Sequence, residues 1–509
     1  MKNDLINKPA AAGLLACLLT VLPACDNILE TIPTDRISSE VYWQNEEDAL
    51  YASNAIYRYL DGIEIIRFDG MTDILHANIQ FSDWAAIERG EYDSNMEYIQ
   101  TLWTQYYKGI RAVNYFLENV DRIEASDLRN LTVLGAEVRT IRAYLYIQLV
   151  MLFGDIPLVT TSMESVQEGK EAHRNPASEI WSFVDKELTE TAATLPVKAA
   201  STGRIAKGAA FALKARANLY QGNWREAADA AKAVMELGEY SLHPSYEKLF
   251  LYENENNREV ILDKQFLKDS YSNNLFALLA PFSQKQQGPV YVPTKNIFDA
   301  YEENDPRLSY SIYLPGAILP NGDTYDPTPG SGTQDEIANT YLATSLGYNI
   351  KKYINPEDLA NPGNCGVNII LVRYAEVLLT YAEAMIEENK IDASVLSAIN
   401  QVRRREDVMA PEITAGLSQS DMRGIIRRER LVELAFEGLR LFDCRRWRTA
   451  ETLFSGRVEG MTYQAGDGSW KTIRIEGFVK IFDPGKHYLF PIPQKEMDLN
   501  PFFTQNPKW

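Results

Sequence analysis

Long runs with helical periodicity are the feature that most restricts how this chain of 509 residues can fold. Apolar residues recur three and four positions apart over residues 97–120 and again over 131–152. This spacing puts them on one face of an α-helix, and that face must pack against a neighbour. Gly154 and Pro157 then supply an ordinary helix stop signal. Further helices are predicted over residues 46–60, 175–196, 369–388, 393–405 and 420–437.

The segment 207–238 indicates how such helices pack. It reads KGAAFALKARANLYQGNWREAADAAKAVMELG, with small residues along both halves and Gly222 at the turn. Small side chains let two antiparallel helices approach closely, and the segment resembles a tetratricopeptide helix pair. Such a repeat buries its apolar face only by stacking, so one good copy implies neighbouring helix pairs.

Helical periodicity fades in two parts of the chain, residues 61–96 and 240–365, where Gly, Pro, Asn and aromatic residues become frequent. Long segments of this composition in a compact protein usually carry function. The last sixty residues are strand- and turn-like. We therefore expect a mainly α fold: a tetratricopeptide-like helical scaffold with an irregular, loop-rich ligand-binding subdomain and few short strands.

The N-terminus has the composition of a secretory signal. Lys2 and Lys8 precede the uncharged run Ala10–Val21, which is too short to span a bilayer. The run ends in Leu-Pro-Ala-Cys25, similar to a bacterial lipobox, which predicts cleavage before Cys25 and acylation of this residue. More than one acyl chain anchors a protein stably. The alternative is a plain secretory signal in which Cys25 is incidental.

These features predict a division of the chain into four regions. The expected regions are a signal peptide (1–24), a lipid-tethered leader (25–45), an N-terminal helical region (46–240) and a C-terminal region (241–509), the last with a loop-rich part (241–368), helices (369–450) and a strand- and turn-rich tail (451–509).

Charge and cysteine content exclude some classes of protein. The formal net charge of −19 makes the chain a poor nucleic-acid binder, because the phosphate backbone would repel it. After removal of the signal and acylation of Cys25, only Cys365 and Cys444 remain, so the chain is not a disulfide scaffold. We expect two separate thiols, although the sequence leaves their pairing open.

The common catalytic and metal motifs are missing. None of the four His residues has a partner at metal-ligand spacing, and neither a phosphate-binding loop nor a Gly-x-Ser-x-Gly elbow occurs. Asn321, Asp323 and Asp326 could hold calcium, but a polar turn is the preferred interpretation. With 70 acidic residues a carboxylate pair for glycoside hydrolysis stays open, although no pair stands out. The arginine-rich runs 403–405 and 427–430 predict ion-paired helix surfaces.

Aromatic residues point to the ligand site. Trp103, Trp181 and Trp224 lie on predicted helix faces and are expected in the core. An exposed ring on a rigid support can stack on a sugar ring while nearby polar groups bind the hydroxyls. The candidate ligand contacts are therefore Asp73, Phe81, Trp84 and Arg89 from the first irregular region and Tyr291, Tyr325 and Tyr341 from the second. The alternative is that these rings fix their own loops to the scaffold.

Short motifs in a fixed order run through almost the whole chain. They include Cys25 with Leu29-Glu30, Tyr42-Trp43, Arg142-Ala143-Tyr144, Leu152–Leu158, Arg373–Val377, Tyr381–Ala384, Glu433–Gly438, Arg440–Asp443 and Leu489–Pro493. In their order and number they resemble the SusD/RagB family of outer-membrane nutrient-uptake lipoproteins.

The resemblance implies a helical scaffold with an irregular ligand-binding face. It also implies a cell-surface protein, lipid-anchored in the outer membrane, that delivers glycans, or sometimes peptides, to a SusC-like TonB-dependent transporter. Neither an enzymatic activity nor a cofactor is expected. One departure is Asp26 directly after Cys25, since an acid there retains lipoproteins at the inner membrane in some bacteria. A peptide-binding member, a secreted glycoside hydrolase and a purely structural adaptor are the alternatives.

Overall fold

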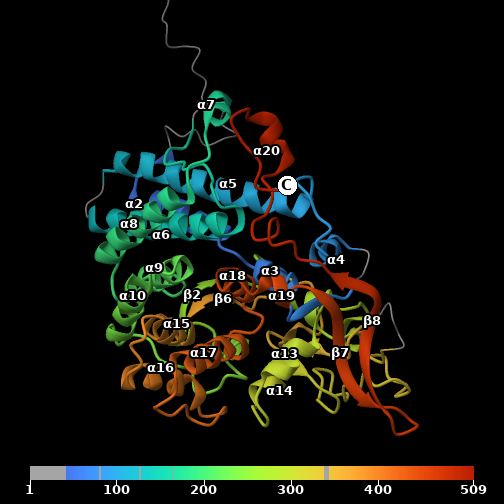
Figure 1. The fold of residues 1–509 in the computed structure, drawn as a ribbon. Helices are drawn as coiled ribbons and strands as arrows, with labels where there is room; N and C mark the ends of the chain where they lie inside the picture. The colour runs from blue at the N-terminus through green and yellow to red at the C-terminus, as the bar shows by residue number, and fades with distance from the viewer. Residues whose placement is uncertain (1–41, 80–81, 125–127, 164, 338–342) are drawn as a thin grey trace, which may run out of the picture.

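A computed structural model describes residues 42–79, 82–124, 128–163, 165–337 and 343–509. Figure 1 shows a stack of helices on one side of the molecule and a more irregular part on the other, from which a long β-hairpin extends. The mainly α architecture predicted from the sequence is confirmed.

Nine longer helices dominate the described residues. They are α2 (Glu46–Ile56), α5 (Glu97–Asn119), α6 (Leu128–Phe153), α8 (Ala177–Thr194), α9 (Lys207–Gln221), α10 (Trp224–Glu236), α15 (Tyr374–Glu387), α16 (Ala393–Arg403) and α17 (Gln419–Glu433). Helix α5 packs on α6, α6 on α8, α8 on α9, α9 on α10, and α10 on α15, which also contacts α16 and α17 (Figure 1). The predicted stacking of helix pairs is therefore present.

Local sequence explains where these helices begin and end. Asn45 and Asp48 form a capping box at the start of α2. Gly222 ends α9 in the left-handed conformation at φ 79°, which is the turn predicted between α9 and α10. Helix α6 is buried over nearly all of its circumference, because α2, α5, α8 and α9 surround it. Trp103 is buried in the core as predicted, whereas Trp181 and Trp224 are half-buried.

Shorter helices occur in the irregular regions and in several connections between the long helices. They are η1 (Tyr57–Tyr59), α3 (Glu64–Gly70), α4 (Asp83–Glu88), η2 (Val120–Arg122), α7 (Val166–Glu171), η3 (Tyr252–Asn254), α11 (Leu275–Leu279), α12 (Phe282–Lys285), α13 (Lys295–Ala300), α14 (Arg307–Ser311), η4 (Pro356–Asp358), α18 (Arg440–Arg446), α19 (Ala450–Leu453) and α20 (Gln494–Leu499). The region 240–365 is thus built from short elements that are too brief to show periodicity.

The described strands form four antiparallel pairs. They are β1 (Leu75–Ala77) with β3 (Tyr291–Pro293), β2 (Val260–Lys264) with β6 (Ile369–Arg373), β4 (Ile312–Tyr313) with β5 (Asn349–Ile350), and β7 (Gly456–Gln464) with β8 (Trp470–Lys480). The predicted helix over 369–388 is wrong in its first turn, where β6 precedes α15. A short apolar run that is buried on both faces shows no period that distinguishes strand from helix.

The arginine-rich runs are ion-paired, but only part of them lies at the surface as predicted. Arg404 and Arg428 are exposed and pair with Glu412 at 3.3 Å and with Glu302 at 2.8 Å. The other members are buried or half-buried, which corrects the prediction for them.

Arg405 is buried and pairs with Glu259 at 2.6 Å and with Glu433 at 2.8 Å. Arg373, from the end of β6, also pairs with Glu433 at 2.8 Å, and so does Arg307 at 2.9 Å. We call these five residues the central ion cluster. It joins β2, α14, β6 and the ends of α16 and α17.

The two remaining cysteines and the C-terminal tail complete the core. Cys365 and Cys444 are buried free thiols, as expected. The tail returns to the end of α6, where the Phe490 amide donates to the Leu152 carbonyl at 2.7 Å. Asn506 donates to the Phe153 carbonyl at 2.8 Å, so the last residues of the chain close the end of its central helix.

Candidate functional site

The two irregular regions lie side by side. Strand β1 pairs with β3, and their register places Ala77 opposite Tyr291. Just beyond β1, the Asn78 side chain donates to the Ala343 carbonyl at 3.0 Å and accepts from the Ser345 amide at 2.8 Å. We call the region formed by α4, the hairpin β7–β8 and the buried segments β1, β3 and 343–348 beneath them the loop face.

Trp84 is the aromatic side chain that α4 places at the loop face. The helix is capped by Ser82, and the half-buried indole lies 4.6 Å from the Tyr98 ring and 6.4 Å from the Tyr291 ring, between centroids. The guanidinium of Arg67 lies 4.6 Å from the Trp84 centroid. A ring held by two aromatic rings and one cation has little freedom, so Trp84 is a rigid contact surface.

Arg89 and Asp73 have different environments. Arg89 is half-buried, donates from Nε to Glu91 at 2.7 Å, and places its guanidinium 5.3 Å from the Phe478 ring centroid. Asp73 is buried and accepts two hydrogen bonds from Arg440, at 2.9 and 2.8 Å. Asp73 therefore fixes the segment after α3 to α18 and is not presented to solvent, in contrast to the expectation from its loop position.

Tyr291 and Tyr325 were expected to expose their rings, and the structure corrects both expectations. Tyr291 is 2% exposed and Tyr325 is 0% exposed. The Tyr291 ring fills the space over Gly70, where an added Cβ would lie 2.3 Å from Cε1. The Tyr325 hydroxyl lies 3.2 Å from the Gly347 carbonyl oxygen, to which it donates. Both rings support the loop face from beneath, which was the alternative interpretation.

Three other predicted residues lie outside the described parts of the chain. They are Cys25, Phe81 and Tyr341. Their predicted roles, lipidation for Cys25 and ligand contact for the two aromatic residues, stay predictions.

A buried charged group joins α4 to the hairpin. Both carboxylate oxygens of Glu88 lie 3.0 Å from Nδ1 of His76, and one lies 2.7 Å from Nζ of Lys480 in β8. Burial opposes ionisation, but the charges of Lys480 and His76 outweigh it and hold the pKa of Glu88 below its usual value. The helix that carries Trp84 is thus fixed to the base of the hairpin.

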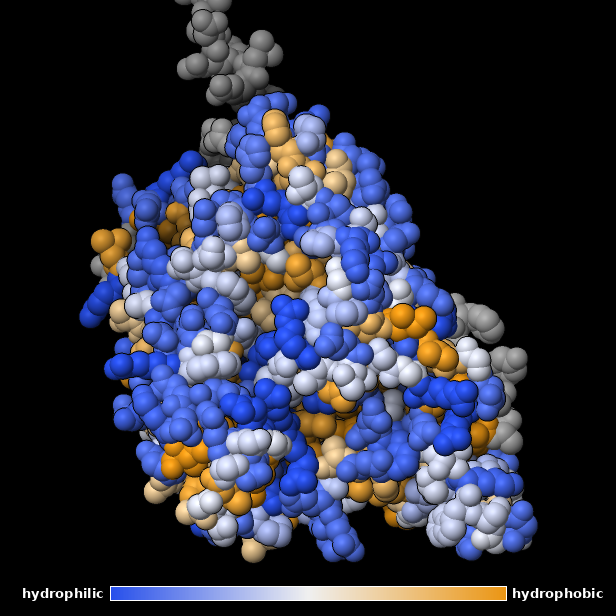
Figure 2. All heavy atoms as spheres, in the orientation of Figure 1, coloured by the Kyte–Doolittle hydropathy of each residue, from blue (hydrophilic) through white to orange (hydrophobic). Residues whose placement is uncertain are grey.

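The hairpin carries an aromatic residue that the sequence interpretation missed. Trp470, the first residue of β8, is 71% exposed. The sequence interpretation recognised Gly466-Asp467-Gly468 as a structural turn. Trp470, two residues after this turn, was the signal that could have indicated an exposed aromatic ring. Figure 2 shows hydrophobic residues gathered over α4 and the end of β8. Val479 and Ile481, at that end of the hairpin, are also exposed.

The acidic turn does not gather a set of metal ligands. Asn321 donates to the Asp323 carboxylate at 2.7 Å, and Asp326 accepts from the Thr328 amide at 3.0 Å. Within the described ranges, no group of three or more His, Cys, Asp and Glu residues is placed to share one metal ion. The same ranges contain no helix that combines the length and the apolar character needed to cross a bilayer.

Stacked helix pairs that support an irregular face with aromatic side chains define a ligand-binding helical-repeat protein. The chain belongs to the SusD family, whose family model matches residues 214–509. A second family model, described as "Starch-binding associating with outer membrane", matches residues 50–219. Members of the SusD family are carbohydrate-binding proteins.

Individual relatives cover most of the chain. SusD-like protein P2 of Formosa agariphila is 26% identical over 426 residues, which is 79% of each chain. The crystal structure of a SusD-like carbohydrate-binding protein from Bacteroides fragilis has a TM-score of 0.83 and 26% identity, covering 91% of this chain and 100% of that one. Surface glycan-binding protein A from Bacteroides thetaiotaomicron, solved with laminarihexaose, has a TM-score of 0.71 at 20% identity, covering 91% and 99%.

Proposed function

We propose that this protein is a cell-surface lipoprotein that binds oligo- or polysaccharide at the loop face and passes it to a SusC-like TonB-dependent outer-membrane transporter. The observation that supports it best is the rigid, half-buried Trp84, located where both irregular regions of a SusD-family chain meet. The carbohydrate-binding relative at 26% identity supports the ligand class.

In this proposal the residues of the loop face divide into contacts and supports. Trp84 stacks on a sugar ring, and Arg89, Phe81 and Tyr341 add contacts, while Tyr291 backs the Trp84 indole. The exposed Trp470 gives the hairpin a second stacking surface for a longer chain. Binding proceeds without turnover, with a dissociation constant on the order of micromolar to millimolar, because the ligand must be released to the transporter.

Attachment and delivery rest on the sequence and on the family. Acylation of Cys25 would hold the body at the membrane surface, and the family description places related proteins at the outer membrane. The acidic body would not be attracted to anionic lipid, so the lipid anchor must supply the attachment. Metabolic labelling with a fatty acid, lost in Cys25→Ser, tests the anchor.

Glycan binding is tested by calorimetry on the form that lacks residues 1–25, with polysaccharides and peptides as ligands. Trp84→Ala should weaken glycan binding about tenfold or more, since truncation of a central aromatic contact commonly costs about 2 kcal/mol. Trp84→Phe keeps a flat ring and should retain most of the affinity.

The matched control is Phe502→Ala, which removes an exposed ring outside the loop face and should leave the affinity unchanged. Thermal melting of each variant shows whether weaker binding results from a lost ligand contact or from a loss of folding. Peptide binding with an affinity that Trp84→Ala leaves unchanged would contradict the glycan proposal and favour a peptide-binding protein. Release of shortened sugars from any polysaccharide would contradict binding without turnover.

A further inference from the structure

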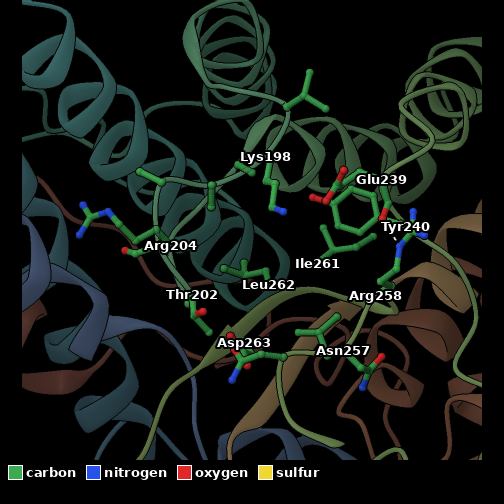
Figure 3. A pocket seen from close by; sticks show the side chains of 18 residues that line it. Lys198, Thr202, Arg204, Glu239, Tyr240, Asn257, Arg258, Ile261, Leu262 and Asp263 are labelled. Atoms are coloured by element: carbon green, nitrogen blue, oxygen red, sulfur yellow. Dashed lines mark hydrogen bonds between the residues drawn. The ribbon is translucent and has the colours of Figure 1, made fainter.

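The molecule has a hollow that shares no lining residue with the loop face. This hollow has a volume of about 640 Å³ and is lined by α2 and η1, by residues 201–204, and by Lys264, Gln265 and Tyr271. We call it the Tyr271 hollow. Residues 201–204 also border a neighbouring hollow of about 380 Å³, whose floor is Ile261 and Leu262 of β2 (Figure 3). The two hollows are therefore neighbours that share one wall.

That shared wall is held in place by hydrogen bonds. Arg204 points away from the smaller hollow in Figure 3 and donates to Asn54 at 2.6 Å and to Ser53 at 3.1 Å. The next residue, Ile205, donates its amide to the Tyr57 hydroxyl at 2.9 Å. Gly203, at φ 79°, rests on Gln265, whose Cγ would lie 2.8 Å from an added Cβ. The hollow is thus formed before any ligand arrives, as is usual for small-ligand sites.

An aromatic ring forms one side of the hollow. Tyr271 is 43% exposed, and its ring stacks on that of Phe266 with an interplanar angle of 7° and a centroid distance of 5.3 Å. Backbone hydrogen bonds of 2.9 Å in both directions between Leu267 and Tyr271 fix the turn that carries the ring. The result is a flat and rigid surface that is partly open to solvent, which suits the apolar face of a pyranose.

Oriented polar groups surround this ring. Asn54 accepts from Arg204 through Oδ1, which turns its Nδ2 donor outward. Gln265 uses Nε2 to donate to Asn256 at 2.9 Å and to Asp263 at 2.7 Å, and its Oε1 is left as an acceptor. Ser201 and Thr202 also line the shared wall.

The cationic residues Arg58 and Lys264 are among those that line the hollow. The Lys264 ammonium donates to the Arg58 carbonyl at 2.9 Å and to the Leu60 carbonyl at 2.7 Å. The Lys264 ammonium is therefore held by the protein backbone. A donor, an acceptor and the Ser201 and Thr202 side chains around a rigid ring suit the hydroxyls of a polyol, and the exposed Arg58 adds further donors for them.

We propose that the Tyr271 hollow is a second carbohydrate site, which takes one or two pyranose units of a neutral glycan stacked on Tyr271. The ligand class rests on the proposed function, whereas the site is separate from the loop face. Two separate sites on one protein would hold a long polysaccharide more tightly than either site alone, because the second contact is made at high effective concentration.

The test is calorimetry on the full-length chain with laminarihexaose, cellohexaose and maltohexaose, followed by the matching polysaccharides. For the glycan that binds, wild type should take two hexasaccharides and Tyr271→Ala only one. Affinity for the polysaccharide should fall about 100-fold. Tyr271→Phe keeps the stacking ring and should keep both sites, and Tyr51→Ala, an exposed tyrosine on α2 that does not line the hollow, is the matched control.

Each outcome separates this proposal from the loop-face proposal. Loss of all binding in Trp84→Ala, with Tyr271→Ala binding the glycan with the same stoichiometry and affinity as wild type, would overturn the second site and keep the first. Loss of all binding in Tyr271→Ala, with Trp84→Ala unaffected, would keep the second site and overturn the loop face. Wild type that binds none of these glycans, or that binds peptides through Tyr271, would overturn the carbohydrate assignment.

Discussion

Three aspartates are buried deeply enough to shift their protonation. Burial raises the pKa of Asp61 to about 6, of Asp69 to about 7 and of Asp263 to about 6. Each carboxylate also accepts hydrogen bonds, which lower the pKa and limit the shift. Asp263 is the simplest case, since one side chain, Gln265, donates to it at 2.7 Å.

Asp263→Asn should therefore stabilise the protein in a pH-dependent manner. The unfolded carboxyl group titrates near 3.8 and the folded one at about 6, so Asp263 lowers the free energy of unfolding as the pH rises from 4 to 6. Asparagine carries no charge and still accepts from Gln265. The variant should exceed wild type by about 1–3 kcal/mol at pH 8 and match it at pH 4.

Urea unfolding at both pH values measures this difference. Asp229→Asn, at an exposed position on α10, is the matched control and should change neither value. An equal difference between Asp263→Asn and wild type at pH 4 and pH 8 would show that Asp263 does not titrate in this range.

At the scale of elements, periodicity predicted the long helices because each buries one face against a neighbour. It failed at β6, where a five-residue run is buried on both sides. The positions of the candidate site residues were predicted only in part. Loop position located Trp84 correctly at the junction of the two regions, but burial of Tyr291 depends on Gly70, which lies far away in sequence. No local sequence pattern predicts a contact between residues so far apart in the chain.

The hairpin β7–β8 makes one close backbone approach to residues 343–348 within the loop face. A Cβ added to Gly460 would lie 2.3 Å from the carbonyl oxygen of Leu346. Gly460→Ala should push the hairpin away from residues 343–348, at a cost of about 1–3 kcal/mol. Hydrogen exchange of residues 456–480 should become faster as the hairpin loosens.

Gly466→Ala provides the matched control, because an added Cβ there has no neighbour within 4 Å. It should leave hydrogen exchange close to that of wild type outside the turn. Unchanged exchange in Gly460→Ala would contradict the close approach at Leu346 and would mean that the hairpin is held by other contacts, such as the Glu88–Lys480 ion pair.

At the scale of the whole molecule, the central ion cluster connects parts of the chain that are far apart in sequence. Glu433 from α17 pairs with Arg307, Arg373 and Arg405. Burial opposes its ionisation, but these three cations outweigh burial and hold the pKa of Glu433 well below its usual value. The stability that Glu433 contributes is therefore fully present above the pKa of an unfolded glutamate and is lost only in strong acid.

Glu433→Gln should destabilise the protein by about 3–5 kcal/mol, because it removes the carboxylate that three buried guanidinium groups share and leaves the cluster short of one negative charge. Denaturant unfolding at pH 7 measures the loss. Glu236→Gln, which removes one partner of an exposed pair with Lys232 on α10, should cost less than about 1 kcal/mol. A loss of similar size in both variants would contradict a structural role for the cluster.

The contacts between the tail and α6 have a consequence for biosynthesis. The carbonyls of Leu152 and Phe153 receive their donors from Phe490 and Asn506, more than three hundred residues later. A chain that is still being made, or is only partly through a translocation channel, lacks these donors. Completion of the native structure must therefore wait for the final residues, and a prematurely terminated copy would expose an unfinished helix end to proteases.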